Sequence, residues 1–430
     1  MPSPLRRQLE GSQAVAETVA RCRPEVVCAY PITPQTHIVE AVSRIALAGE
    51  LGSCQVINVE SEFAAMSVAI GASATGARAY TATASQGLLY MAEALFNAAG
   101  LGLPIVMTVA NRAIGAPINI WNDHSDSMAM RDCGWIQLYA ADNQEACDLH
   151  VQAFRIAEEL STPVMVCMDG FILTHAFEPL TVPSQEDVDA FLPAFEPRQV
   201  LDPDDAMTIG AMVGPEAFTE VRYLQHAKQI QALDVIPAVA EEFRARFGHA
   251  SGGLLESYRC DGAETIVLAL GSVSGTLAEV IDERWDAGIP VGLVTLKSFR
   301  PFPLGELRAA LEDASRVVVL ERALAVGIGG VVCDNVRTAL AGLPVEAHTV
   351  IAGLGGRAIT RRSLHRMIDQ LLAGSLGELH FLDLDLDVVE RELGRSGIGL
   401  AGPRTPGGPR PGPHAEAILR ELGSVAAGPV

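Results

Sequence analysis

Three polar residues each follow a run of strand-forming residues in the first half of the chain. They are Thr33, Glu62 and Arg112, which follow the apolar runs at 26–30, 56–60 and 104–111. In open parallel sheets, ligands gather outside the carboxyl ends of the strands. A hydroxyl, an acid and a cation that converge on one such edge can bind a carboxylate and control one proton.

Each of these residues also has a plainer interpretation. A desolvated Glu62, at the start of a segment of small residues, suits a group that shares a proton with a ring nitrogen. Ser61 and Glu62 equally suit the first turn of a helix beside its dipole, and the local sequence alone favours that second interpretation. Arg112 could pair with a substrate carboxylate or form an ordinary ion pair in a loop. Thr33 lies in "PITP", where two prolines restrict the backbone around its hydroxyl.

Two other kinds of site have weaker support in the sequence. Asp123, His124 and Asp126 crowd together in "WNDHSDSM", but one histidine and two aspartates do not fix a coordination geometry, so we assign no metal to this chain. The glycine loops "GSVSG" (271–275) and "GLGGRA" (353–358) each follow an apolar run. They could receive a phosphate or a dinucleotide, but tight-turn packing is the more probable explanation of both.

Regular alternation of apolar runs and helical stretches predicts the scaffold. Runs at 26–30, 56–60, 79–84, 104–111 and 163–169 predict one parallel sheet, and runs at 264–270, 289–296, 316–322 and 345–351 predict a second. The expected fold class is therefore α/β with two doubly wound domains. We expect a first domain at 1–240 with a linker at about 178–206, a second at 250–380, and a Pro/Gly-rich arm or tail at 381–430.

Composition narrows the class of protein. The 430 residues are 49% hydrophobic and carry a formal net charge of −21. This predicts a globular protein that binds neither nucleic acid nor anionic membrane. No secretory signal is visible, and Asn97 and the Gly/Pro punctuation after it argue against a membrane span at 94–111. We expect a cytoplasmic protein.

Cysteine and lysine usage restricts the chemistry further. The eight cysteines are scattered without a C-x-x-C pair, which indicates free thiols and argues against an iron–sulfur cluster or a structural zinc held by this chain alone. Electrons, if they flow, must therefore pass through a partner. Only Lys228 and Lys297 could form a Schiff base.

Several long motifs occur in order along residues 10–395. They are "AYPITPQT", "VESEFAAMSVAIGASATGARAYTATASQGL", "ANRAIGAPINIWNDHSDSMAMRDCGWIQLYA", "MDGFILTH", "LALGSVSGTLAEV", "FRPFP" and "GLGGRAIT". Together they resemble the α subunit of the 2-oxoacid:ferredoxin oxidoreductases, most of all the pyruvate type.

The resemblance implies a thiamine-diphosphate enzyme divided among chains. Its first domain would be of the pyrimidine-binding type, and its second would be like the C-terminal domain of transketolases. Glu62 would bind the aminopyrimidine N1′, with Pro31 and Ile32 also contacting the cofactor. Thr33 and Arg112 would hold the 2-oxoacid carboxylate. The reaction implied is oxidative decarboxylation with coenzyme A, giving acyl-CoA and CO2.

Thiamine enzymes of the kind that this chain resembles hold the diphosphate through Mg2+ with a Gly-Asp-Gly sequence and an asparagine further along the chain, and this chain lacks that pattern. Asp169-Gly170 lacks a preceding glycine, and no asparagine occurs between Asn143 and Asn335. A β subunit should therefore supply the Mg2+ and diphosphate site, and γ and ferredoxin-like δ subunits the Fe–S clusters. We expect an obligate hetero-oligomer with a large apolar interface.

Some alternatives remain open. Pyruvate is the favoured substrate, and 2-oxoglutarate, branched-chain 2-oxoacids and phenylglyoxylate are the others. The β component of a 2-oxoacid dehydrogenase has the same domain order, but "YPITPQT" and "NRAIGAP" argue against it. A non-catalytic scaffold paralogue is the rival from another class, and intact Thr33, Glu62 and Arg112 argue against that.

Overall fold

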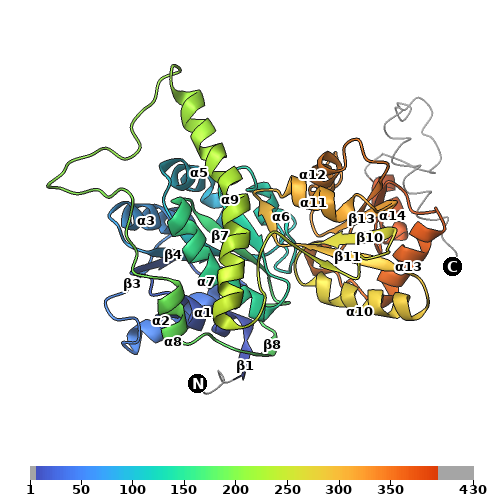
Figure 1. Ribbon diagram of the computed structural model, residues 1–430, viewed down its shortest axis with the longest axis horizontal. Coiled ribbons are helices and arrows are strands. Elements are labelled where there is room, and N and C mark those ends of the chain that lie inside the picture. The colour runs from blue at the N-terminus through green and yellow to red at the C-terminus, as the bar shows by residue number, and fades with distance from the viewer. Residues whose placement is uncertain (1–5, 396–430) are drawn as a thin grey trace.

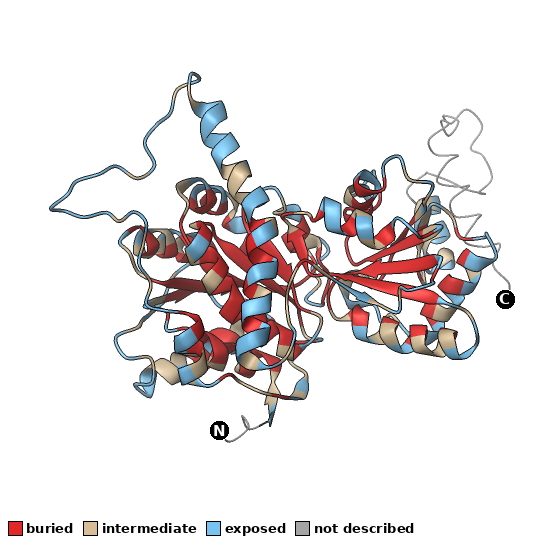
Figure 2. Cartoon of the chain, in the orientation of Figure 1, coloured by how far each residue is buried: buried red, intermediate tan, exposed pale blue. Residues whose placement is uncertain are grey.

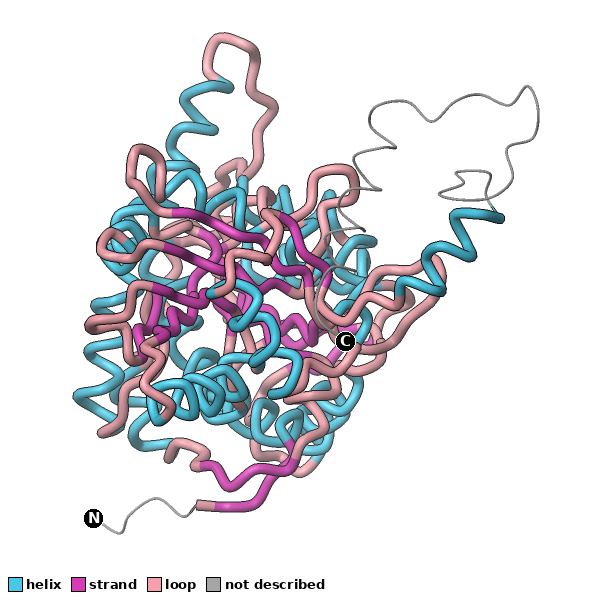
Figure 3. The backbone as a smooth tube through the Cα atoms, turned by 90° about the vertical axis from the view of Figure 1, so that its right-hand side faces the viewer, coloured by secondary structure: helices cyan, strands magenta, loops and turns pink. Residues whose placement is uncertain are grey.

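Two α/β domains lie side by side in the computed structural model, which describes residues 6–395 (Figure 1). Most of the predicted Pro/Gly-rich arm, residues 396–430, lies outside the described residues. Figure 3, turned by 90°, shows the strands in the middle of the molecule with helices on both sides of them. This is the layered arrangement expected from alternating apolar runs and helices.

The first domain contains a seven-stranded sheet that is parallel except at one edge. Its spatial order is β12 (Ser298–Arg300), β6 (Ile136–Tyr139), β7 (Val164–Asp169), β5 (Val106–Asn111), β4 (Ala79–Thr83), β2 (Val26–Ala29) and β3 (Gln55–Asn58). The five strands predicted from the sequence are all present. β6 and β12 were not predicted, and β12 pairs antiparallel with β6.

Helices cover both faces of this sheet. They are α1 (Gly11–Arg21), α2 (Thr36–Leu47), α3 (Glu62–Ala74), α4 (Ser85–Tyr90), α5 (Ala92–Leu101), α6 (Ser125–Ala129), α7 (Asn143–Leu160), α8 (Gln185–Phe191) and α9 (Phe218–Phe247). Alternate side chains of the central strands enter different cores: Val164 and Val166 pack with α1, α2 and α7, whereas Met165 and Cys167 pack with α3 and α5. Burial on both faces explains why these strands are continuous apolar runs.

The second domain has a six-stranded sheet. Its order is β15 (Leu379–Phe381), β14 (Glu346–Ile351), β13 (Arg316–Glu321), β10 (Thr265–Ala269), β11 (Val291–Leu296) and β9 (Leu255–Tyr258), with only β9 antiparallel. The accompanying helices are α10 (Val273–Asp286), α11 (Leu304–Leu311), α12 (Val332–Ala339), the 3-10 turn η1 (Leu354–Gly356), α13 (Arg361–Leu372) and α14 (Leu386–Arg395). All four predicted strands of this domain are present.

The two domains share a core. One apolar cluster contains Met107 and Met165 from the first sheet together with Leu268 and Val319 from the second. Figure 2 shows buried strands running through both halves of the molecule. In addition, β12 leaves the second domain and extends the sheet of the first. A continuous core and a shared sheet fix the relative position of the domains.

The segment predicted as a linker, at about 178–206, contains regular structure at its start. β8 (Phe177–Leu180) pairs antiparallel with β1 (Arg7–Glu10), and α8 packs against α9 through Phe191 and Phe243. The chain then forms a long exposed loop and returns through the exposed first turns of α9, which project from the body (Figures 1 and 2). No helix within residues 6–395 is both long enough and apolar enough to cross a membrane.

Candidate functional site

The carboxyl ends of four neighbouring strands meet at one edge of the first sheet. In spatial order β3 leads to Glu62, β2 to Thr33, β4 to Ser85 and β5 to Arg112. These strands are parallel, so all four residues follow the same edge. This is the edge at which the sequence placed the candidate site.

Glu62 is the first residue of α3. Ser61 makes the helix cap by accepting a hydrogen bond from the backbone N–H of Ala64 over 3.1 Å. The Glu62 side chain is only 8% exposed, and it has no hydrogen-bond or ion-pair partner within residues 6–395. The helix start is thus capped without Glu62, which leaves the buried carboxylate available for a ligand. Its place in the first turn of α3 favours a negative charge there.

Gly87 forms one side of the space around this carboxylate. A Cβ atom at Gly87 would lie 2.7 Å from Glu62 Oε1 and 2.6 Å from Thr83 Oγ1. Glycine therefore lets α4 approach the Glu62 side chain closely. The Thr83 hydroxyl is also buried without a hydrogen-bond partner in the described part of the chain. Neither residue was predicted from the sequence as part of the site, although "SQGL" directly follows a predicted strand.

Asp126 connects the start of α4, the helix that contains Gly87, to the loop that contains Arg112. Its Oδ2 accepts hydrogen bonds from the backbone N–H groups of Ser85 and Arg112, both over 2.9 Å. Its Oδ1 accepts from Asn111 Nδ2 over 2.8 Å. Burial raises the pKa of Asp126 despite these donors. A single buried carboxyl group thus sets the spacing of two loops at the site.

Ser85 has a backbone conformation that a non-glycine residue rarely adopts. Its φ is +51°, in the left-handed region. Asp126 holds its N–H group, and its hydroxyl donates to the carbonyl oxygen of Ala113 over 2.5 Å. Strained backbone of this kind clusters at functional sites, where the surrounding structure maintains it.

Arg112 holds two backbone carbonyls at once. Its Nε donates to Asn119 O over 3.1 Å, and its Nη1 donates to Thr33 O over 2.9 Å. Nη2 has no partner within residues 6–395. Burial lowers the pKa of Arg112, and nearby Asp126 opposes that effect. One edge of a fixed guanidinium group therefore remains available to an anion.

The Thr33 loop lies on the surface. Thr33 is exposed, and the structure brings it to Arg112 through its backbone carbonyl rather than its hydroxyl. Pro31 is exposed, and Ile32 is half-buried. The Ile32 carbonyl accepts hydrogen bonds from the N–H groups of Gln35 and Thr36, which begin α2. No backbone hydrogen bond within residues 6–395 joins Pro31 or Ile32 to Glu62.

Asp123, His124 and Asp126 do not converge on one point. Asp123 accepts a hydrogen bond from the N–H of Gly355, and His124 Nε2 lies 2.7 Å from Asp169 Oδ1. Asp126 binds the loop amides described above. Each of the three residues therefore joins a different pair of segments.

Asp169, at the end of β7, ties the first domain to the second. Its carboxylate lies 2.6 Å from Arg322 Nη1 and accepts hydrogen bonds from the N–H and hydroxyl groups of Ser272. Burial alone would raise the pKa of Asp169, but Arg322 and His124 outweigh it and hold the pKa below its usual range. Ser272 in the "GSVSG" loop therefore binds a carboxylate of the protein itself. This contact lies at the start of α10, the position at which a phosphate could otherwise bind.

The second glycine loop also joins the domains. Gly355 donates its N–H to Asp123 and accepts from Asn119 Nδ2 over 3.1 Å. Gly356, at φ +81°, lies so close to Trp121 that a Cβ atom would collide with it. Both glycine loops thus serve domain packing, which agrees with the tight-turn interpretation.

Neither lysine lies at this edge of the sheet. Lys297 Nζ forms a buried ion pair with Glu145 Oε1 over 2.7 Å, just before β12. Burial alone would lower the pKa of Lys297, but Glu145 outweighs it and raises the pKa. Lys228 donates to the carbonyl oxygen of Ser161 over 3.0 Å, where it attaches α9 to the end of α7. Both lysines therefore hold elements together.

Two family models match consecutive parts of the chain. Residues 17–241 match "Pyruvate flavodoxin/ferredoxin oxidoreductase, thiamine diP-bdg", and residues 263–364 match "Pyruvate:ferredoxin oxidoreductase core domain II". The first match contains the whole edge described above.

Curated relatives align over nearly their full length. The chain is 47% identical to pyruvate synthase subunit PorA of Methanosarcina barkeri over 392 residues, covering 89% of this chain and 97% of the relative. It is 38% identical to ketoisovalerate oxidoreductase subunit VorA of Pyrococcus horikoshii, covering 86% and 94%.

A solved structure shows the same fold. The 2-oxoglutarate:ferredoxin oxidoreductase from Magnetococcus marinus superposes with a TM-score of 0.69 at 20% identity, and the match covers 86% of this chain and 65% of that longer one. That structure contains 2-oxoglutarate, coenzyme A and succinyl-CoA. The resemblance inferred from the motifs is confirmed, and the dehydrogenase β component is set aside. The chain belongs to the pyruvate:ferredoxin oxidoreductase family, as the α-subunit type within the 2-oxoacid:ferredoxin oxidoreductases.

Proposed function

We propose that this chain is the α subunit of a thiamine-diphosphate-dependent enzyme that oxidatively decarboxylates pyruvate with coenzyme A. The observation that carries this proposal is the buried Glu62 carboxylate, which has no hydrogen-bond or ion-pair partner within residues 6–395 and lies against Gly87, a residue without a side chain. Two electrons per turnover would leave through Fe–S clusters on partner subunits to ferredoxin or a similar acceptor. The products would be acetyl-CoA and CO2.

The residues around Glu62 fit an aminopyrimidine ring. The Glu62 carboxyl group would form a hydrogen bond with ring nitrogen N1′ and share one proton with it. The buried Thr83 hydroxyl lies beside it without a hydrogen-bond partner in residues 6–395, and Gly87 presents no side chain. Bound thiamine diphosphate supplies the nucleophilic ring carbon and the electron sink for decarboxylation. Pro31 and Ile32 would contact the cofactor from the Thr33 loop.

Arg112 and Thr33 would hold the 2-oxoacid. The free Nη2 edge of Arg112 suits a carboxylate, because a guanidinium offers parallel N–H groups at fixed spacing. The exposed Thr33 hydroxyl would add a further hydrogen bond. Arg112 is anchored by two carbonyl groups, so little additional ordering accompanies substrate binding.

Partner subunits would complete the site. Large apolar side chains are exposed beside the Glu62 and Gly87 loops, namely Tyr30, Ile57, Phe63 and Tyr90. Phe63 and Tyr90 pack together, with ring centroids 6.4 Å apart. An exposed apolar group of this kind marks an interaction surface. A β subunit seated there would bring the Mg2+ and diphosphate site, and γ and δ subunits would carry the electron path. The eight free cysteines fit a reducing cytoplasm.

An anaerobic assay of the assembled complex tests this function. The complex is purified through a tag on this chain, and reduction of a viologen dye is followed with coenzyme A and pyruvate, 2-oxoglutarate, 2-oxoisovalerate or phenylglyoxylate. Reduction that requires both coenzyme A and pyruvate supports the proposal, whereas reduction with another oxoacid alone would reassign the substrate. A Glu62→Gln complex that assembles normally should lose turnover even at saturating substrate. Unchanged turnover in that variant would indicate a scaffold role for this chain.

A further inference from the structure

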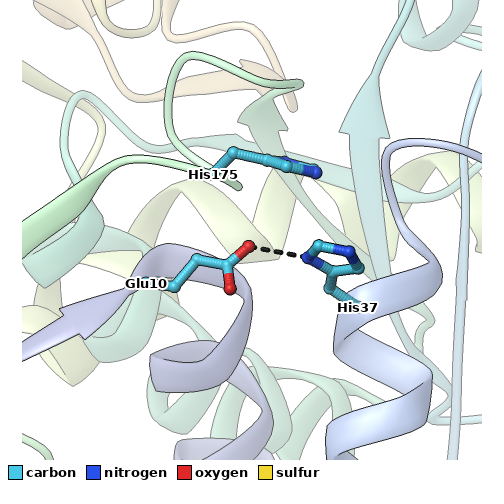
Figure 4. A group of neighbouring side chains, drawn as sticks. All are labelled: Glu10, His37 and His175. Carbon is cyan, nitrogen blue, oxygen red and sulfur yellow. Dashed lines mark hydrogen bonds and ion pairs between the residues drawn. The ribbon is translucent and has the colours of Figure 1, made fainter.

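Glu10, His37 and His175 come together at a place that no sequence motif indicated (Figure 4). Glu10 ends β1, His37 lies in the first turn of α2, and His175 lies in the turn between β7 and β8. His37 Nδ1 is 2.7 Å from Glu10 Oε1, and the two imidazole centroids are 4.6 Å apart. One possible ligand atom from each residue lies within 4.8 Å of the other two.

We propose that these three side chains bind one Zn2+ ion. Two imidazole nitrogens and one carboxylate oxygen form a donor set that zinc uses with a water molecule in the fourth position. Mg2+ and Ca2+ prefer oxygen ligands, so the two histidines argue against them. Donor atoms in a tetrahedral zinc site lie about 3.4 Å apart, given bonds of roughly 2.1 Å. All three side chains are at least partly exposed, so they have room to rotate toward that spacing when the ion binds.

The backbone around the cluster is already fixed. Gly11 donates its N–H to Ala176 O over 3.0 Å, and Ser12 donates its N–H to Thr174 O over 2.9 Å. These two hydrogen bonds lie immediately beside Glu10 and His175 and lock their segments together. Binding an ion therefore requires ordering of side chains only, which keeps its entropic cost low.

A neighbouring hydroxyl can orient one of the ligands. Thr174 Oγ1 lies 2.7 Å from His175 Nδ1 and also accepts the N–H of Phe171 over 2.8 Å. When His175 donates its Nδ1–H to this oxygen, Nε2 carries the lone pair that a metal needs. Support of this kind from a second residue is typical of metal-bound histidines.

An ordinary ion pair explains only part of the cluster. A Glu10–His37 contact at a half-exposed position contributes little to stability and does not need a second imidazole. The His175 ring nevertheless packs directly on His37 and continues to Phe171, whose ring centroid is 4.7 Å away. A shared cation gives both imidazoles and the carboxylate a common partner.

The ion would connect three segments that border the substrate loop. His37 follows the Thr33 loop within the same helix start, and Gly170 packs against Pro34 so closely that a Cβ atom would lie 2.7 Å from its Cγ. Zinc at this position would therefore hold the start of α2 against the turn after β7. It is separate from the Mg2+ that a partner's diphosphate site would carry.

Calorimetry on the full-length chain tests the proposal. Chain freed of metal by a chelator is titrated with ZnCl2, and we expect one zinc per chain. His37→Ala and His175→Ala should each weaken binding at least tenfold, as should Glu10→Gln, while His226→Ala on the exposed surface of α9 should bind like the wild type. Equal melting temperatures in chelator establish that the variants are folded. Zinc should raise the melting temperature of the wild type and of His226→Ala only.

X-ray absorption distinguishes this site from the cysteines. The zinc-loaded chain should show only nitrogen and oxygen ligands, with bonds of about 2.0–2.1 Å. A sulfur shell at about 2.3 Å would overturn the proposal. So would absence of zinc binding in the wild type, or unchanged affinity in a folded His37→Ala/His175→Ala double variant.

Discussion

Arg112 and Thr33 are joined by a hydrogen bond from Nη1 of the guanidinium to the backbone carbonyl oxygen of Thr33, over 2.9 Å. The bond crosses from the loop after β5 to the loop after β2. Arg112 therefore positions the backbone of the threonine with which it would share a substrate. This dual role makes the geometry of the side chain as important as its charge.

Replacing Arg112 should chiefly weaken binding of the 2-oxoacid. In Arg112→Lys the charge stays, but an ammonium group cannot hold two carbonyls and present a flat edge to a carboxylate. We expect KM for the oxoacid to rise at least tenfold in Arg112→Lys and further in Arg112→Ala, with a smaller change in KM for coenzyme A. Steady-state dye reduction by the purified complex measures both. Arg44→Ala, on the exposed side of α2, is the control, and unchanged affinity in Arg112→Ala would refute the carboxylate clamp.

A methyl group at Gly87 should displace the Glu62 carboxylate. The new Cβ atom would lie 2.7 Å from Oε1 and 2.9 Å from Cγ of Glu62, closer than atoms pack. We expect Gly87→Ala to reduce turnover tenfold or more in a complex that still assembles. Gly71→Ala, on the same helix as Glu62, meets no atom within 4 Å and should retain full activity. It should also gain about 0.5–1 kcal/mol in unfolding free energy. Equal turnover in the two variants would remove Gly87 from the site.

Asp126→Asn should separate two loops that the carboxylate holds together. An amide has one acceptor oxygen, so its NH2 group must face either the N–H groups of Ser85 and Arg112 or those of Asn111 and Ser127, and one of these pairs of hydrogen bonds is lost. A donor left unsatisfied in this way costs about 1–3 kcal/mol. Urea unfolding should show this loss, and turnover should fall as Ser85 relaxes from its left-handed conformation. Asp132→Asn, at an exposed position after α6, should change neither quantity.

Removing Arg322 should leave the buried Asp169 carboxylate between the domains without its arginine partner, with His124 and Ser272 remaining as its contacts. We expect Arg322→Met to lower the unfolding free energy by about 3–5 kcal/mol, whereas Arg337→Met breaks an exposed pair with Asp334 and should cost less than about 1 kcal/mol. Because the pKa of Asp169 is depressed in the folded chain, its contribution is complete above its ordinary value and is lost only at lower pH. The difference in unfolding free energy between wild type and Arg322→Met should therefore be the same at pH 6 and at pH 8, since both values are well above the ordinary pKa of an aspartate.

His150 should make the chain less stable as the pH falls from about 6.5 to 4. It is fully buried between Thr108 Oγ1 and the carbonyl oxygen of Ala146, and burial lowers its pKa from 6.5 to about 4. The unfolded chain takes up a proton throughout that window while the folded chain does not, so the unfolding free energy decreases. Between pH 7 and pH 5 this histidine accounts for about 2 kcal/mol. His150→Gln should remove that part of the pH dependence in urea titrations, and His226→Gln should not.

The strand ends at the site could be predicted because their signals are local. Continuous apolar runs bounded by turns indicate buried parallel strands, and parallel strands place Thr33, Glu62 and Arg112 at one edge whatever the details of packing. Regular structure in the predicted linker at 178–206 was missed because its short strand β8 is stable only through pairing with β1. β12, three residues long, likewise exists only as an extension of the sheet in the other domain.

By itself, the sequence determined the two-domain α/β scaffold, the family, and the three residues at the strand ends. Only the tertiary structure decided what those residues contact. Asp126 joins two loops, Gly87 lies against Glu62, and Asp169 pairs with Arg322. Folding of the chain brings these residues together, and their separation in the sequence gives no sign of the contacts. Periodicity encodes which face of an element is buried, whereas pairing between distant side chains depends on packing, which exists only after the sheets and helices have assembled.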